Sequence, residues 1–353
     1  MAADAHLSAT DRLRGAAVRA LTRLPQPAQR ALAGGGKVTR DGLELHHEAQ
    51  LVIALARRSG RPAIEELPLA QARAETVQRA LSTRGPMEPV ARREDLELPG
   101  PAGPLAARLY GPPRDERAGL LVYFHGGGHV IGDLTTCESV CRFLSHHAGV
   151  NVLAVDYRLA PEHPFPAAAD DATASLRWAA KEAEALGADP GRIAVGGDSA
   201  GGNIATVAAL DTATGEGPVP DFQLLIYPVC DYSFKRPSYT AFDQGFLLTK
   251  AEMDWFREHY LPEEQMRSDP RASPLLAEDL SGMPPAYVAT AGFDPLRDEG
   301  EEYARAMAAA GVPVALRRHD GLVHSFANWT GMGRSSRDAM LEAAGALRLG
   351  LAG

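Results

Sequence analysis

Disulfide frameworks, membrane-spanning segments and an excess of positive charge are all lacking in this sequence of 353 residues. Its three cysteines are too few, and odd in number, for a disulfide framework. No apolar run reaches the roughly 18 residues of a membrane-spanning helix, and the N-terminus lacks the apolar core of a secretory signal. The net charge of −9 would repel nucleic-acid phosphates. We therefore expect a cytoplasmic protein with no nucleic-acid partner and no stable membrane insertion.

Two smaller features have competing interpretations. Cys137 and Cys141 share a helical face, but no cluster of His or Cys at ligand spacing accompanies them, so we expect buried small side chains rather than a metal site. Near the N-terminus, four apolar residues fall on one helical face: Leu13, Ala17, Leu21 and Leu24. A peripheral membrane helix and a transit-like segment are alternatives there, and we favour a docked or frayed terminal helix.

Strands alternate with helices over most of the chain. The residue pattern predicts strands at 105–110, 120–124, 151–155, 192–196, 222–227, 286–291 and 313–319. Helical periodicity predicts helices near 135–147, 168–186, 203–211, 298–310 and 335–349. Such alternation is typical of an α/β fold with a mostly parallel central sheet flanked by helices.

Two further regions are expected to form a helical cap. Residues 1–90 read as helices separated by Gly and Pro, and we assign them to the cap, which leaves 91–353 as the catalytic domain. The segment of about 232–283 has no convincing strand and many aromatic residues. Within it, Thr249 and Glu252 form a capping box, and Pro262 ends the helix. Its aromatic residues are either a lid over a pocket or simply core.

A serine sits on a sharp turn between a predicted strand and a predicted helix. Residues 197–202 read Gly-Asp-Ser-Ala-Gly-Gly, the G-x-S-x-G pattern of a hydrolytic nucleophile at Ser199. The flanking glycines, Gly197 and Gly201, lack Cβ atoms and permit the strained turn. Upstream, residues 125–128 read His-Gly-Gly-Gly after another apolar run, where a hydrolase needs backbone N–H donors for an oxyanion. Two motifs with complementary tasks stand in the expected order.

The nucleophile needs a base, and the base needs an orienting acid. His324 follows the predicted strand at 313–319 and is the favoured base, with His319 as the alternative. Asp294 precedes a proline, which keeps it in the loop after a strand, whereas Asp298 reads as a helix-start residue. The order Ser199, Asp294, His324 is that of nucleophile, acid and base in α/β hydrolases.

These motifs, with Tyr-Arg-Leu-Ala-Pro-Glu-His-Pro-Phe-Pro-Ala at 157–167, resemble the hormone-sensitive-lipase-like family of bacterial esterases from about residue 90 onward. The resemblance implies an α/β-hydrolase fold, Ser199, Asp294 and His324 as the triad, and no cofactor or metal. It further implies that the N–H groups of Gly127, Gly128 and Ala200 form the oxyanion hole. The family usually has an aromatic residue after the glycines, where this chain has His129.

The expected activity is serine-dependent hydrolysis of carboxylic esters with short to medium acyl chains, the ester being a small molecule. Amidase, lactonase and dehydratase activities on the same scaffold are alternatives. A non-catalytic ligand receptor is a further one, but relatives of that kind lose the catalytic histidine, and His324 is present. Because dimers are common in the family, a homodimer is among the expected states.

Overall fold

The computed structural model describes residues 9–114, 117–215 and 217–352. Its strands are β1 (Thr39–Arg40), β2 (Leu43–Glu44), β3 (Arg92–Gly100), β4 (Gly103–Gly111), β5 (Ala118–Phe124), β6 (Asn151–Val155), β7 (Ala188–Asp198), β8 (Phe222–Ile226), β9 (Ala286–Phe293) and β10 (Val314–Val323). Its α-helices are α1 (Ala9–Leu21), α2 (Gln26–Leu32), α3 (His47–Arg58), α4 (Leu69–Thr83), α5 (Glu138–Ala148), α6 (Ala167–Lys181), α7 (Ala200–Thr214), α8 (Pro237–Ala241), α9 (Lys250–Tyr260), α10 (Arg297–Ala309) and α11 (Arg334–Gly350). Short 3₁₀ helices are η1 (Ile64–Glu66), η2 (Glu264–Ser268), η3 (Pro274–Leu276) and η4 (Phe326–Trp329).

Eight strands form one sheet in the order β10-β9-β8-β7-β5-β6-β4-β3. The pairs from β10 to β6 are parallel, and β4 pairs antiparallel with both β6 and β3. The expected mostly parallel sheet is confirmed. Strand β3 was not predicted, because it begins with four consecutive charged residues, Arg92 to Asp95, and only Leu96 and Leu98 are large apolar residues in it.

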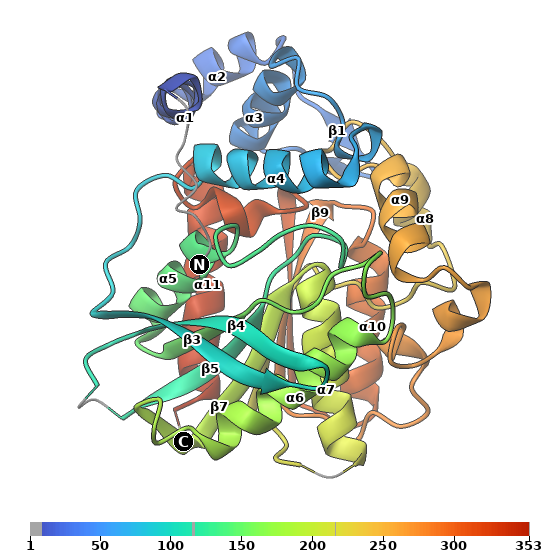
Figure 1. Ribbon diagram of the computed structural model, residues 1–353. Coiled ribbons are helices and arrows are strands. Elements are labelled where there is room, and N and C mark those ends of the chain that lie inside the picture. Colours follow the sequence, from blue (N-terminus) through green and yellow to red (C-terminus); the bar gives the residue numbers. More distant parts are fainter. Residues whose placement is uncertain (1–8, 115–116, 216, 353) are drawn as a thin grey trace.

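Helices cover both faces of this sheet (Figure 1). Side chains from α6, α7 and α10 pack on one face, and those from α5 and α11 pack on the other. Along β5, Val122 and Phe124 point into the first layer, whereas Leu121 and Tyr123 point into the second, as the alternation of a strand requires. The two apolar layers hold the sheet rigid beneath its loops.

The cysteines are divided between these two layers. Cys137 and Cys141 lie in the layer beneath α5 and α11, with 3% and 0% of their surfaces exposed. Cys230 is fully buried in the opposite layer. All three are free thiols, which agrees with the expectation of buried small side chains.

Above one edge of the sheet lie the N-terminal helices and the segment that carries α8 and α9 (Figure 1). A third apolar cluster joins α3 to Phe242 and Phe246 of that segment, and includes Phe293 and Val323 at the ends of β9 and β10. Phe242, Phe246 and Tyr260 are almost fully buried, so these aromatic residues are mainly core. Phe234, by contrast, is 63% exposed.

Helix α1 packs against α4, but not through the predicted leucine stripe. Gly15 is the buried contact, and a Cβ atom there would collide with the carbonyl oxygen of Ser82. Leu13 is 72% exposed and Leu24 is 37% exposed. The expected docked helix is present, with Leu13 and Leu24 of the predicted stripe exposed and Leu21 half-buried. None of the described helices combines the length and the apolar character that crossing a membrane would need.

Candidate active site

Ser199 stands between β7 and α7 on a backbone turn that few residues adopt. Its φ of 56° and ψ of −121° lie outside the usual regions for a residue with a side chain. A Cβ atom on Gly197 would collide with the backbone of Gly201, and one on Gly201 would collide with the carbonyl oxygen of Phe124. The two glycines are therefore required for close backbone approach, and the turn keeps Ser199 at the carboxyl end of the sheet.

Three loops at that same edge bring the predicted triad together. His324 Nε2 lies 2.9 Å from Ser199 Oγ, and His324 Nδ1 lies 2.7 Å from Asp294 Oδ2. Because a carboxylate only accepts hydrogen bonds, Nδ1 carries the imidazole proton and Nε2 offers its lone pair to the hydroxyl. The other oxygen of Asp294 accepts a hydrogen bond from Leu296 N at 2.9 Å, which fixes the carboxylate.

The three side chains of the predicted triad are almost fully buried. The exposed fractions are 0% for Asp294, 4% for His324 and 9% for Ser199. Each residue directly follows a strand, namely β9, β10 and β7. Since the carboxyl ends of parallel strands meet at one edge, residues far apart in the sequence become neighbours.

The two alternative residues lie elsewhere. Asp298 accepts a hydrogen bond from Ser238 N at 2.9 Å and pairs with the Arg297 guanidinium at 2.8 Å. His319 belongs to β10 and packs edge-on against Phe326. Neither side chain contacts Ser199. The geometry therefore favours Asp294 as the acid and His324 as the base.

The glycine loop after β5 faces the nucleophile turn. Gly126 N donates to Asp198 Oδ1 at 2.9 Å, and Tyr123 Oη donates to the same oxygen at 2.7 Å. Gly127 and Gly128 have φ angles of 125° and 60°, and their N–H groups donate to no acceptor within the described ranges. Ala200 is the first residue of α7, where an N–H has no intrahelical acceptor. These three donors are thus available to a ligand.

Side chains that sequence reasoning missed hold this loop in place. Asp198 is one, and only its position beside Ser199 could have pointed to it. Arg73 of α4 is another: it donates to the carbonyl oxygens of Val130 at 2.9 Å and Ala160 at 3.0 Å. Arg73 also pairs with Glu162 at 2.6 Å. No local sequence signal marks Arg73, because its partners lie 57 to 89 positions away.

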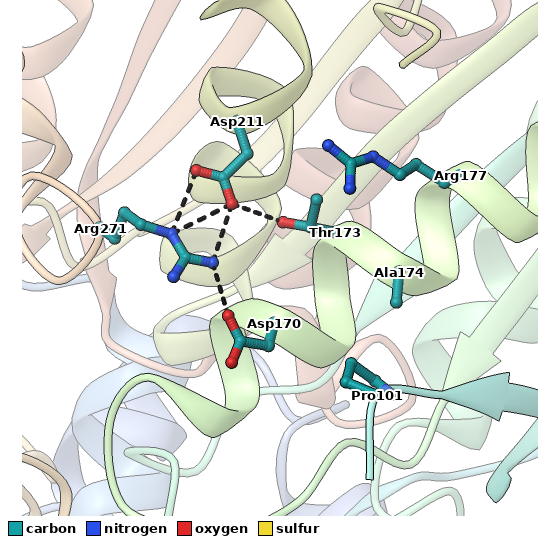
Figure 2. A pocket seen from close by; sticks show the side chains of 7 residues that line it. All are labelled: Pro101, Asp170, Thr173, Ala174, Arg177, Asp211 and Arg271. Carbon is teal, nitrogen blue, oxygen red and sulfur yellow. Dashed lines mark hydrogen bonds and ion pairs between the residues drawn. The ribbon is translucent and has the colours of Figure 1, made fainter. Parts of the chain in front are cut away.

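A cavity of about 360 Å³ is lined by residues that include Asp170, Asp211 and Arg271. Figure 2 shows the side chains that line it. There Arg271 pairs with Asp170 and Asp211 at 2.9 Å each, and Thr173 donates to Asp211 at 2.8 Å. No triad residue lines this cavity. Its polar groups bond to one another and tie the segment carrying Arg271 to α6 and α7.

One group of side chains has the composition of a metal site. Ligand atoms of Glu88, His146 and His147 lie within 4.8 Å of one another. However, the Arg337 guanidinium contacts Glu88 Oε1 at 2.8 Å and His147 Nε2 at 3.4 Å. A cation therefore already occupies the position that a metal ion would need, and the group reads as an ion-pair cluster.

Comparison with known proteins gives a consistent result. Residues 121–328 match a family model described as the alpha/beta hydrolase fold. Carboxylic ester hydrolase LipN of Mycobacterium tuberculosis is 45% identical over 340 residues, which cover 94% of this chain and 90% of that protein. An ethyl acetate hydrolase of Pseudomonas putida is 45% identical over 63% of this chain and 71% of its own length.

Solved structures agree with these matches. A thermostable esterase from Pseudomonas putida ECU1011 superimposes with a TM-score of 0.83 at 32% identity, covering 87% of this chain and 98% of that one. The ester hydrolase EH1AB1 from the metagenome of Lake Arreo, solved with a derivative of bipyridine phosphonate, has a TM-score of 0.83 at 41% identity. It covers 86% of this chain and 98% of its own.

Proposed function

The chain belongs to the α/β hydrolase family, in its hormone-sensitive-lipase-like group, and is a carboxylic ester hydrolase; we propose that Ser199, His324 and Asp294 carry out the hydrolysis. The observation that carries this assignment is the pair of contacts at 2.9 Å and 2.7 Å that join the three side chains. The 2.9 Å distance lies within the range for proton transfer from a nucleophile to its base, and the 2.7 Å distance joins that base to the acid that orients it.

Hydrolysis follows from the roles that these contacts define. His324 Nε2 takes the proton of Ser199 as the hydroxyl oxygen attacks the ester carbonyl. Asp294 holds the proton on Nδ1 and stabilises the imidazolium that forms. The imidazolium then protonates the leaving alcohol, and an acyl-enzyme remains. A water molecule, deprotonated by His324, attacks the acyl carbon, and the acid leaves as Ser199 regains its proton.

The negative charge on the carbonyl oxygen needs donors that are already in place. The N–H groups of Gly127, Gly128 and Ala200 supply them. Removing one such donor from a serine hydrolase costs roughly 10² to 10³ in kcat. The bond from Gly126 N to Asp198 supports this assignment, because it fixes the backbone immediately before the donors.

Short to medium acyl chains are the proposed substrates. The ring of Phe256 on α9 packs directly against Gly128, and only 9% of the Ser199 surface is exposed. Rates on p-nitrophenyl esters of increasing chain length should fall for long chains, with no jump in rate above the solubility limit of a triglyceride. The same panel should include activated amides and lactones, whose preferred cleavage would instead support the alternative activities.

We also propose that residues 1–90 and the segment of about 232–283 form one cap on a catalytic domain of residues 91–353. Hydrogen bonds between the two parts support this: Arg40 Nη1 donates to Ala241 O at 2.8 Å, and Arg57 Nη2 donates to Gly245 O at 2.9 Å. A homodimer and a cytoplasmic location are further proposals, which light scattering and cell fractionation would test.

Labelling of the nucleophile tests the central assignment. A fluorophosphonate should inactivate the enzyme and leave an adduct that mass spectrometry assigns to Ser199. Ser199→Ala should remove the adduct and reduce esterase activity to a small residual. Ser233→Ala, which changes an exposed serine of the cap segment, is the matched control and should keep both. An adduct on another residue would refute the assignment.

A further inference from the structure

His129 occupies an unusual position directly after the glycine loop. Its φ of 63° is left-handed, a region that residues with side chains seldom adopt. Its carbonyl oxygen accepts a hydrogen bond from Ala160 N at 2.8 Å, and none of its surface is exposed. Such a backbone conformation persists only where surrounding contacts hold it.

Those contacts come from the cap segment. The His129 ring stacks on Tyr260 with a centroid separation of 3.7 Å and an interplanar angle of 11°. Its Nε2 atom lies 2.9 Å from Tyr232 Oη. Tyr232 lies at the start of the cap segment and Tyr260 lies at the end of α9. The cap segment therefore contacts the His129 side chain on two sides.

The protonation state of His129 follows from burial. Desolvation lowers the pKa of His129 to about 3, so the imidazole is neutral at ordinary pH and carries a single N–H. Nδ1 has no hydrogen-bond partner in the part of the chain that the structure describes. Because an unpaired buried N–H is rarer than an unpaired acceptor, the proton belongs on Nε2, which donates to Tyr232 Oη.

We propose that His129 is a positioning residue: by donating to Tyr232 and stacking on Tyr260, it fixes the Gly127–Gly128 backbone and thereby couples the cap to stabilisation of the oxyanion. This inference rests on the proposed function, since it assigns the donors to these glycines. The catalytic reason is geometric, because donors act fully only when held within about 0.5 Å of the productive arrangement. An aromatic hydrocarbon at this position could stack on Tyr260 but could not bond to Tyr232.

Two conservative substitutions isolate the hydrogen bond. His129→Phe keeps a ring for stacking and removes Nε2, while Tyr232→Phe removes only the hydroxyl. Each should lower kcat for p-nitrophenyl butyrate at least fivefold with KM changed less than twofold. The double variant should be no slower than the slower single variant, because both substitutions remove the same hydrogen bond between His129 and Tyr232. Tyr239→Phe, in the same segment, is the matched control and should leave both constants unchanged.

A second readout separates positioning from general loosening. Replacing the ester carbonyl oxygen with sulfur weakens the hydrogen bonds in the oxyanion hole, so the rate ratio of oxo-ester to thiono-ester should fall in both single variants. Melting temperatures identify any variant that fails to fold, in which case Tyr232→Phe alone decides.

Three results would overturn the proposal: wild-type kcat in Tyr232→Phe, independent losses that multiply in the double variant, or an unchanged rate ratio. Failure of the proposed function is distinguishable from these, since it would show as a fluorophosphonate adduct away from Ser199 in the unmodified enzyme.

Discussion

Asp294 lies in the loop before α10 and Asp298 lies in the first turn of that helix, and we expect their carboxylates to have different tasks. Asp294→Asn should lower kcat by on the order of 10⁴, as expected when the acid that fixes the histidine tautomer is neutralised. Asp298→Asn should leave kcat near that of the wild type and cost about 1–2 kcal/mol of stability, because it weakens the bond from Ser238 N. Ester hydrolysis and chemical unfolding of both variants provide the measurements. An exchange of the two phenotypes would refute the assignment of Asp294.

Glu299 is a buried carboxyl group whose titration should appear in stability. It accepts hydrogen bonds from Cys230 N and Asp231 N, with 1% of its surface exposed, and Oε2 has no partner among the described residues. Desolvation raises the pKa of Glu299 to about 8 from its usual 4.5. Between these values the unfolded chain is ionised while the folded protein keeps its proton, so the folded state loses stability as pH rises.

Glu299→Gln should remove this dependence. The free energy of unfolding of the wild type should fall, relative to that of the variant, by at most about 1.4 kcal/mol per pH unit between about pH 4.5 and 8. Denaturant unfolding at several pH values measures it, with Glu258→Gln on the exposed side of α9 as the control. Parallel curves for wild type and Glu299→Gln would contradict the raised pKa.

At the scale of elements, helix α9 and the glycine loop restrict each other. A Cβ atom on Gly128 would collide with the ring of Phe256, and the φ of 60° adds a backbone cost of only about 1–2 kcal/mol for a residue with a side chain. Since the collision is the larger obstacle, Gly128→Ala should lower kcat/KM strongly, and adding Phe256→Ala should restore part of it. Steady-state kinetics decide this, and a double variant no better than Gly128→Ala would identify backbone strain as the cause.

The central strands and the proximity of Ser199, Asp294 and His324 were predictable, whereas the contacts that support the glycine loop were not. The runs at 120–124 and 152–155 are continuously apolar because both faces of each strand are buried, so β5 and β6 fall where expected. Strand β10 continues beyond the predicted end at 319 to Val323, after an irregular register that follows His319. The contacts of Arg73 and His129 depend on three-dimensional packing and leave no periodic trace in the sequence.

For the whole molecule, the proposed cap is attached to the proposed catalytic domain by polar contacts as well as by apolar packing. Arg73 fastens α4 to the loop at Val130 and Ala160, on the N-terminal side of the cap. Arg271 fastens the second cap segment to α6 and α7 through Asp170 and Asp211 (Figure 2). Because these contacts lie on separate segments, we expect that removing the contacts of Arg73 would leave those of Arg271 in place, and the reverse.

The division of the cysteines between the two apolar layers makes them reporters of how the protein opens. A side-chain hydrogen bond with Cys141, together with burial, raises the pKa of the Cys137 thiol well above its usual range, and burial does the same for Cys230, so both thiols are shielded and react slowly in the native state. Brief pulses of a thiol-reactive dye, read by peptide mass spectrometry, should modify no cysteine in the folded protein. In mild denaturant, modification of Cys230 before Cys137 and Cys141 would show that the layer beneath α6, α7 and α10 separates first, whereas equal rates would show a single cooperative opening of both faces of the sheet.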